Sequence, residues 1–185
     1  IELPELEEND PFPFSEKDLK KLWNDYGKGN KMTGYILLMI YTGMMPGELI
    51  KAKKDMIDWE KQQIVGAGLK TKKRKQTPIV IADFLIPVLR DLCEFSQTDQ
   101  LLAIHRDAFY AEFHEILFRC GIEDRTPYAC RHTTATAMAL GNIAPSVIQS
   151  VMRHAKFSTT ERYIHTDRDT ATMHNAVNLI MPPKQ

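Results

Sequence analysis

The 185-residue sequence has little that would place the chain in a membrane or outside the cell. Its longest apolar run, Tyr35 to Tyr41, is far shorter than the roughly 18 residues that a membrane-spanning helix needs. The first ten residues are acidic, whereas a signal peptide begins basic and continues apolar. No CxxC pair and no even set for disulfides can be made from the three cysteines, Cys93, Cys120 and Cys130. We therefore expect a cytoplasmic protein that does not enter a membrane.

Motifs for metal or nucleotide chemistry are missing as well. There is no glycine-rich phosphate loop, no HExxH and no pair of Cys or His ligands, and His105, His114 and His174 stand without such partners. We therefore expect neither a metal nor a cofactor. Hydrophobic residues at 43% and charged residues at 26% are ordinary for a globular protein, which excludes a disordered chain. Because the sequence does not begin with Met, we expect a fragment of a longer protein.

A net charge of zero conceals an uneven distribution. Residues 1–10 carry five acids and no base, whereas residues 51–75 carry nine bases against three acids. Such a local excess of positive charge is typical of a surface that binds a polyanion, although a solvated hairpin with a basic tip is an equal alternative. The lysines and the arginine that we expect to bind DNA are Lys51, Lys53, Lys54, Lys72, Lys73, Arg74 and Lys75.

Apolar residues recur at helical spacing through most of the chain. After a proline-containing linker over 1–14, helices are predicted over 15–26, 32–42, 46–50, 83–92, 107–120, 126–141, 145–152 and 168–180, with a further helix start at Ser158. Ser15 with Asp18, Pro46 and Asp107 mark starts of helices. Three short runs, 56–59, 62–65 and 77–81, have the composition of strands. We predict a single domain over 15–185, mainly α with a small three-stranded antiparallel β-sheet.

Two groups of residues indicate chemistry on a phosphate. Arg131 and His132 follow the predicted helix start at Thr126, where unpaired amides favour an anion, although a surface Arg-His pair alone means little. Tyr163 lies nine residues after His154. A tyrosine hydroxyl can act as a nucleophile if cations and a proton acceptor assist it, since its reference pKa is about 10. The alternative is a half-buried amphipathic side chain.

Four segments, taken in order, resemble the motifs of the tyrosine recombinases, also called the phage integrase family. Thr126–Thr136 (TPYACRHTTAT) is similar to the family's arginine motif, and Met152–His165 (MRHAKFSTTERYIH) to its terminal motif with the nucleophilic tyrosine. Tyr41–Leu49 (YTGMMPGEL) resembles the first arginine motif, and Gly68–Thr71 ahead of Thr77–Ile79 resembles the β-hairpin lysine. The resemblance covers about residues 14–180, nearly the whole chain.

The resemblance implies a mechanism. Tyr163 would attack a DNA phosphodiester to leave a 3′-phosphotyrosyl bond and a free 5′-hydroxyl. Arg131 would hold the nonbridging oxygens, His154 would donate to the same phosphate, and Lys70 would protonate the leaving oxygen. Glu48 matches an acidic position that supports the site, and His132 follows the arginine as it does in the family. The covalent bond would conserve the free energy for rejoining, so that no cofactor is implied.

Two positions depart from the family pattern. Met45 stands where the first arginine motif has its arginine, and Tyr128 stands three residues before Arg131 where a histidine is usual. Loss of one phosphate ligand would cost on the order of 3–4 kcal/mol of transition-state stabilisation. Tyr128 can still donate a hydrogen bond. For Met45 three interpretations stay open: a nearby base such as Lys51 substitutes, the enzyme is slow or inactive, or the residue is an introduced change.

The sequence thus predicts the catalytic domain of a site-specific DNA recombinase, the integrase of a mobile element, without its N-terminal DNA-clamping domain. Double-stranded DNA is the expected partner, with a monomer in solution, a homotetramer on DNA, a directionality factor as a further partner and the nucleoid of a prokaryotic host as the location. The helix over 168–180 would dock on a neighbouring protomer or pack in cis. The alternatives are a DNA-binding relative that has lost cleavage and a relaxing topoisomerase with the same chemistry.

Overall fold

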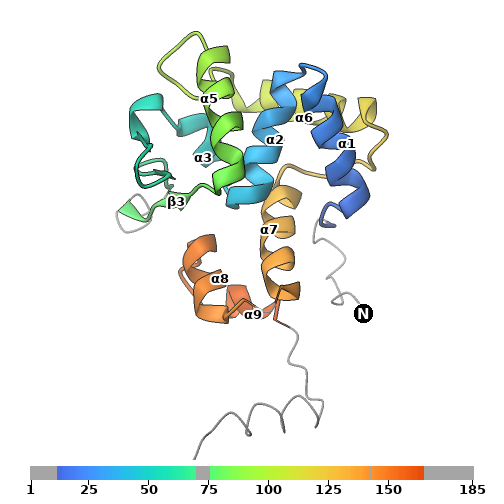
Figure 1. Cartoon of the computed structure of the whole chain (residues 1–185). Coiled ribbons are helices and arrows are strands. Elements are labelled where there is room, and N and C mark those ends of the chain that lie inside the picture. The colour runs from blue at the N-terminus through green and yellow to red at the C-terminus, as the bar shows by residue number, and fades with distance from the viewer. Residues whose placement is uncertain (1–11, 70–75, 142, 165–185) are drawn as a thin grey trace, which may run out of the picture.

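The computed structural model describes residues 12–69, 76–141 and 143–164 and confirms the mainly helical fold (Figure 1). The predicted helix over 168–180 and the basic residues 70–75 lie outside the described residues. The helices are α1 (Glu16–Gly27), α2 (Lys31–Thr42), α3 (Pro46–Lys51), α5 (Ile86–Phe95), α6 (Arg106–Arg119), α7 (Tyr128–Leu140), α8 (Pro145–Met152) and α9 (Ser158–Glu161), with 3-10 turns η1 (Lys54–Met56) and η2 (Asp83–Leu85). No helix of this described part is long and apolar enough to cross a membrane.

The three predicted strands form one antiparallel sheet in the order β1-β2-β3. β1 (Ile57–Asp58), β2 (Gln63–Ile64) and β3 (Ile79–Val80) are shorter than the apolar runs that predicted them. In the register Ile57 opposes Ile64, and Ile64 opposes Ile79. Ile64 and Ile79 are buried, so that the sheet covers one side of the helical core.

Of the three helix starts predicted from Ser15, Pro46 and Asp107, two are confirmed and one is wrong. Ser15 and Asp18 form a reciprocal capping box before α1, and Pro46 is the first residue of α3. The cap of α6, however, is His105, and Asp107 lies in the first turn of that helix. A carboxylate is stabilised in the first turn by the helix dipole just as it is at the cap position, so the residue type alone does not separate the two places.

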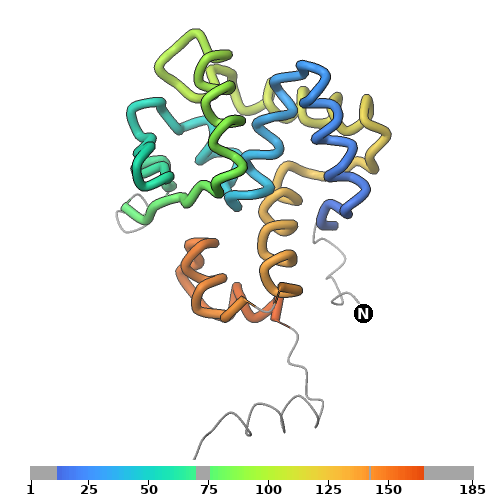
Figure 2. Tube along the Cα trace, in the orientation of Figure 1, coloured from blue at the N-terminus to red at the C-terminus, as the bar shows by residue number. Residues whose placement is uncertain are grey.

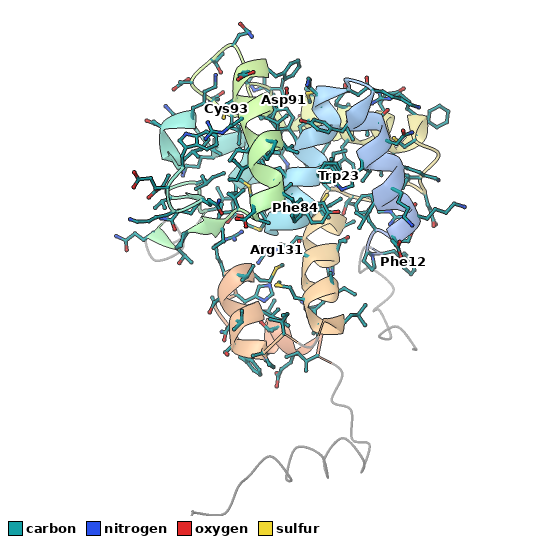
Figure 3. All side chains as sticks on the ribbon, viewed as in Figure 1. Phe12, Trp23, Phe84, Asp91, Cys93 and Arg131 are labelled. Atoms are coloured by element: carbon teal, nitrogen blue, oxygen red, sulfur yellow. The ribbon has the colours of Figure 1, made fainter. Side chains whose placement is uncertain are left out.

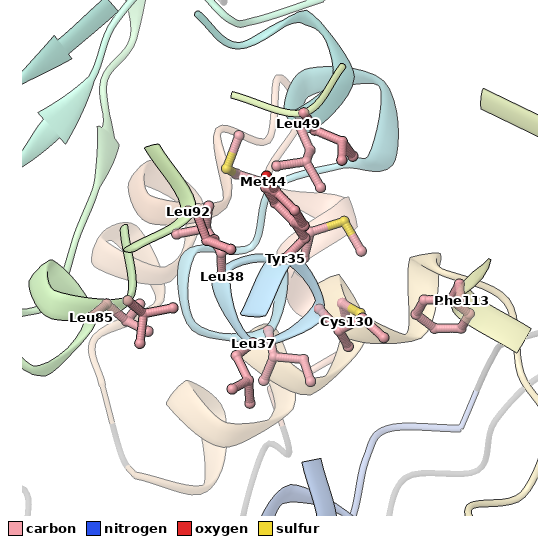
Figure 4. Close-up of a cluster of buried hydrophobic side chains, with 14 of the residues drawn as sticks. Tyr35, Leu37, Leu38, Met44, Leu49, Leu85, Leu92, Phe113 and Cys130 are labelled. Carbon is pink, nitrogen blue, oxygen red and sulfur yellow. The ribbon is translucent and has the colours of Figure 1, made fainter. Parts of the chain in front are cut away.

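The core is built around α2, the apolar run from Met32 to Thr42 that the sequence predicts to be a helix. Its residues Tyr35 to Ile40 are at most 2% exposed, and α1, α5, α6 and α7 pack around it (Figure 4). The Tyr35 hydroxyl donates to the carbonyl of Leu101 at 2.8 Å, which satisfies its polar group inside the core. Phe14, placed in the linker by the sequence, is 5% exposed and packs in this core.

Helix α7 extends from this body and carries the α8–α9 segment at its far end (Figure 2). Its first half packs on α2, and the Thr134 hydroxyl donates to the carbonyl of Ile40 at 2.6 Å. A second, smaller cluster of buried apolar side chains joins α7 to α8 and consists of Ala135, Ile148 and Met152. The C-terminal ends of α2 and α8 thus meet the middle of α7 at the junction between the two clusters.

Asp25 on α1 should make the fold sensitive to acid. Burial raises the pKa of this carboxyl, but hydrogen bonds from Arg119, Thr33 and Asn30 outweigh burial and hold its pKa below the reference value of 3.8. Because the folded state favours the ionised form, the stabilisation is complete above pH 3.8 and is lost as the pH falls through the folded-state pKa. The ionised carboxylate should therefore stabilise the fold at neutral pH and contribute much less in acid.

The measurement is urea unfolding of Asp25→Asn beside the unsubstituted protein. At neutral pH we expect the variant to lose about 2 kcal/mol, less than the roughly 3–5 kcal/mol of a fully buried pair, because the Arg119 side chain is 38% exposed. The difference between the two proteins should shrink at about pH 3. A difference that grows in acid would contradict this account of the network.

Candidate functional site

Arg131 links the end of α2 to the end of α8. It is the fourth residue of α7 and is 9% exposed, at the junction between the main body and the α8–α9 segment (Figure 3). Its Nη1 donates to the carbonyl oxygen of Gly43 at 2.6 Å, and its Nη2 donates to the carbonyl of Met152. The fork of the guanidinium therefore fixes two segments that are far apart in the sequence, as this side chain's planar donors allow.

Gly43 has a backbone conformation that suits this role. It ends α2 with φ of 65°, in the left-handed region that glycine adopts without a steric penalty. A Cβ at this position would lie 2.9 Å from the sulfur of Met152. Because α2 ends at this residue, the carbonyl of Gly43 accepts hydrogen bonds from the two arginines and not from the backbone of a further helical turn.

A second arginine, Arg153, reaches the same carbonyl. Its Nη2 lies 3.2 Å from the Gly43 oxygen and 2.9 Å from Oε2 of Glu48. Its Nη1 donates to the carbonyl of Val151 at 2.9 Å. The side chains of Arg153 and Glu48 are 1% and 0% exposed, so that this is a fully buried ion pair.

Met45 lies on the same turn as Glu48. It precedes α3, and its backbone N–H donates to Oε2 of Glu48 at 2.9 Å. Glu48 therefore receives hydrogen bonds from the backbone at position 45 and from the guanidinium of Arg153. Arg153 lies 105 positions further along the chain. Lys51, the substitute suggested by the sequence, is exposed at the end of α3.

Tyr163 contacts both histidines of the predicted site. Its Oη lies 2.9 Å from Nδ1 of His132, and its ring is nearly parallel to that of His154, at 13° and 6.4 Å between centroids. In the tautomer with Nδ1 unprotonated, His132 accepts the phenolic hydrogen. A hydroxyl beside an imidazole nitrogen is the arrangement of a nucleophile and its general base. The sequence predicted the tyrosine and the histidine but not their contact.

The end of α8 brings His154 to this place. Arg153 has φ of 55°, so that the chain reverses and the His154 N–H donates to the carbonyl of Gln149 at 3.0 Å. His154 Nδ1 then lies 2.9 Å from Oγ1 of Thr160 on α9, and Tyr163 follows directly after that helix. His154 and Tyr163 are therefore fixed relative to each other by a few local contacts.

Other predicted residues lie around this centre or outside the described part of the chain. Tyr128 is the first residue of α7, one turn before Arg131, and is 43% exposed. Lys53 pairs with Asp99 at 2.9 Å, and Lys54 donates to the carbonyl of Ser96 at 2.7 Å. Residues 70 and 72–75 lie outside the described residues, so that the role of Lys70 and the DNA contacts of that segment stay predictions.

Neighbouring groups do not compete with this chemistry. Burial raises the pKa of the Cys130 thiol, which therefore stays neutral beside Arg131 and packs as a small apolar side chain. In the residues that the structure describes, no three His, Cys, Asp or Glu side chains lie close enough to hold a metal ion. Within the described residues, the site comprises two arginines, two histidines, a buried carboxylate and a tyrosine.

Comparison with curated proteins places the chain among recombinases. It is 25% identical over 172 residues to the tyrosine recombinase XerA of Thermococcus onnurineus, over 86% of this chain and 60% of that protein. It is 23% identical over 197 residues to the tyrosine recombinase XerC of Caldanaerobacter subterraneus, over 96% of this chain and 53% of that protein. The chain thus spans little more than half the length of these relatives.

Solved structures share the fold. A Tn1549 transposon integrase in complex with a circular intermediate DNA superposes with a TM-score of 0.77 at 16% identity, over 95% of this chain and 68% of that one. A XerA recombinase superposes with a TM-score of 0.71 at 20% identity, over 96% and 67%. Residues 14–169 match the phage integrase family, which covers every described residue of the site. The chain therefore belongs to the phage integrase family, the tyrosine recombinases.

Proposed function

We propose that this chain is the catalytic domain of a site-specific DNA recombinase, the integrase of a mobile element. It would cut and rejoin double-stranded DNA through a 3′-phosphotyrosyl intermediate. The observation that carries the proposal is the contact of the Tyr163 hydroxyl with His132 Nδ1 at 2.9 Å, on the helix that also holds Arg131. A DNA-binding module would need the cations but neither the nucleophile nor its base.

In the cleavage step Tyr163 Oη forms a bond to phosphorus and its proton passes to His132 Nδ1. The bond from phosphorus to the 5′-oxygen breaks, and Lys70 returns a proton to that oxygen. Rejoining reverses the step: a 5′-hydroxyl of the partner strand attacks phosphorus and releases the tyrosine. One phosphodiester is exchanged for one phosphotyrosyl bond and back, so that the reaction needs no external source of free energy.

The positive side chains stabilise the charge that builds on the nonbridging oxygens during this attack. Arg131 brings a permanent charge and a planar fork. The Nδ1 of His154 lies 2.9 Å from the Thr160 hydroxyl, and His154 would donate to the phosphate through its Nε2. Glu48 holds the arginine cluster from the side of α3. Tyr128 lies one turn from Arg131 and would supply the hydrogen bond that a histidine gives elsewhere in the family.

The expected partners follow from the same assignment. DNA would lie against the lysines of 51–54 and the basic segment around 70–75. Among the structural relatives, the Tn1549 transposon integrase was solved with transposon right end DNA and the XerH recombinase with its difH substrate. We infer a monomer that assembles to a homotetramer on DNA, with an N-terminal clamping domain, a directionality factor and a place on the nucleoid in the cytoplasm.

Covalent trapping tests the proposal. The full-length protein is incubated with nicked duplexes tiled over the DNA that flanks its gene, because a nick beside the scissile phosphate lets the cleaved end diffuse away. We expect a protein band that is covalently linked to DNA. Digestion of this band should yield one peptide that carries a nucleotide, the peptide that contains Tyr163. A recombinase joins the cleaved end to a strand of a second duplex, whereas a relaxing topoisomerase reseals the original strand. Recombinant products therefore distinguish the two enzymes. DNA binding without any covalent band would contradict the proposal and would favour the DNA-binding relative that has lost cleavage.

A further inference from the structure

We propose that Arg125 and Thr133 anchor residues 12–15, here called the linker segment, to the catalytic domain. The anchor fixes the direction in which the preceding part of the full-length protein leaves this domain, so that both parts hold DNA as one preformed clamp. The inference rests on the N-terminal DNA-clamping domain of the proposed function and makes Arg125 a positioning residue. It is carried by the contacts of the linker segment with the loop before α7 and with α7 itself.

Arg125 holds the backbone of the linker segment. Its Nη1 donates to the carbonyl of Pro13 at 2.8 Å and lies 3.4 Å from the carbonyl oxygen of Phe12. Its Nε donates to the carbonyl of Glu123 at 3.1 Å, and its Nη2 lies 3.6 Å from Oδ2 of Asp18. The Arg125 side chain is 8% exposed. One nearly buried guanidinium thus joins the linker segment, the loop before α7 and the first turn of α1.

Phe14 fixes the linker segment to two further elements. The guanidinium carbon of Arg125 lies 4.7 Å from the centroid of the Phe14 ring, and the ring packs edge-on against Phe113 of α6 with 6.5 Å between centroids. The Phe14 N–H donates to Oγ1 of Thr133 at 2.8 Å, and that hydroxyl donates to the carbonyl of Ala129 one turn earlier on α7. The linker segment is therefore bound to α6 and to the helix that carries the site.

These contacts give the chain a defined exit from the domain. Ser15 caps α1, and its N–H and hydroxyl both donate to Asp18, so that the linker segment continues directly into a helix. The ring of Pro13 fixes φ within the segment. In the view of Figure 3, Phe12 lies on one side of α7 and the α8–α9 segment lies on the other. A domain attached before residue 12 would therefore start opposite the segment that leads to the nucleophile.

A fixed exit changes how two linked DNA-binding parts act together. Once one part is bound, binding of the other is intramolecular, and its effective concentration falls when the connection can point away from the DNA. A connection that is ordered before binding also avoids the loss of backbone entropy during binding. The contacts of Arg125, Phe14 and Thr133 lie wholly within the chain. They therefore order the linker segment before DNA is bound.

The test measures DNA affinity of the full-length protein by fluorescence anisotropy, on the flanking duplex that it binds most tightly. Arg125→Met keeps an apolar side chain over the Phe14 ring but loses the donors to the carbonyls. Thr133→Val keeps the shape but loses the acceptor for the Phe14 N–H. We expect each variant to bind about 10-fold more weakly, because the second part of the clamp is no longer oriented. The cleavage rate at saturating protein should stay within a few-fold of the parent.

Arg90→Met is the matched control. Arg90 also stacks on an aromatic ring, that of Trp59 at 4.4 Å, but it lies on α5 and does not contact the linker segment. Its DNA affinity should stay within about two-fold of the parent. The slope of log Kd against log salt concentration should be the same for Arg125→Met and the parent, because Arg125 would orient a domain and not bind a phosphate. Thr133→Val changes no charge and should show the same loss of affinity.

A third measurement separates anchoring from stability. Chymotrypsin cleavage after Phe14 reports release of the linker segment in the folded protein, and it should be about 10-fold faster in both anchor variants. Thermal unfolding is followed in parallel. A merely structural role would lower the unfolding temperature and leave the DNA affinity of the folded protein unchanged. If the two variants do not fold, a Gly-Ser-Gly insertion between residues 10 and 11 decides, because it adds a flexible joint and alters no contact of the linker segment.

Several outcomes would overturn the inference. They are an unchanged affinity in both anchor variants or after the insertion, an equal loss in Arg90→Met, and a loss in Arg125→Met that a smaller salt slope accounts for. Any of these beside a covalent adduct from the parent would leave the proposed function intact. A parent that binds DNA without an adduct would remove the proposed recombinase, and the affinity ratios would still decide on the anchor. A parent that does not bind DNA would remove both.

Discussion

Tyr163→Phe should reduce formation of the covalent protein–DNA adduct to below detection while DNA binding is unchanged. The substitution removes only the Oη atom that would bond to phosphorus. The phenyl ring can keep its stacking on His154 and its packing beside Ala135, Ile148 and Met152. Gel analysis of trapped complexes and a filter-binding assay measure the two properties.

Tyr110→Phe is the matched control. Tyr110 lies on α6 beside Phe109 and is partly buried, and the substitution again removes a single hydroxyl. We expect trapping at the parent level. Both variants should unfold within about 1 kcal/mol of the parent, the usual net value of one hydrogen bond. An adduct that persists in Tyr163→Phe would mean that another residue is the nucleophile.

Arg131→Lys should slow cleavage by a factor on the order of 100–1,000, the effect of losing one preorganised donor at a developing negative charge. Lysine keeps the charge but not the planar fork, so it cannot hold the Gly43 and Met152 carbonyls together. We also expect a loss of about 2 kcal/mol in the free energy of unfolding, because a hydrogen bond to a buried carbonyl is removed. Single-turnover cleavage and urea unfolding measure the two effects.

The comparison variant for Arg131 is Arg119→Lys. Arg119 also makes a forked contact, with Asp25, but it lies on α6 and belongs to the pair that stabilises α1. Its substitution should weaken the fold by a similar or smaller amount and leave the cleavage rate within a few-fold. If both variants lost cleavage to the same degree, the effect of Arg131 would be one of stability and not of phosphate binding.

Local sequence patterns predict much of this architecture. The apolar run of α2, the capping box at Ser15, the Pro46 helix start and the three strand-like runs are all decided by neighbours in the sequence, and the structure confirms them. The error at Asp107 has the same origin, since a local pattern fixes the residue type of a helix start more firmly than its register. Phe14 was misplaced because burial under α6 depends on residues about 100 positions away.

In the site, likewise, local patterns predict the residues but not the contacts between distant parts of the sequence. The motifs identified Tyr163, Arg131, His154, His132 and Glu48 from spacing and resemblance. They could not show that Tyr163 meets His132 across 31 residues or that Arg153 meets Glu48 across 105. An arginine directly before His154 is unremarkable in the sequence. Its meaning appears only when the left-handed turn at the end of α8 directs its side chain toward α3.

The small apolar cluster between α7 and α8 has a consequence for how the molecule opens. The main core surrounds α2, whereas the segment that carries Tyr163 is joined to α7 by Ala135, Ile148 and Met152 and to α2 through the two arginines. Subglobal unfolding generally begins where buried contacts are sparse. We therefore expect the segment that carries the nucleophile to unfold at a lower free energy than the scaffold that holds α2 and α3.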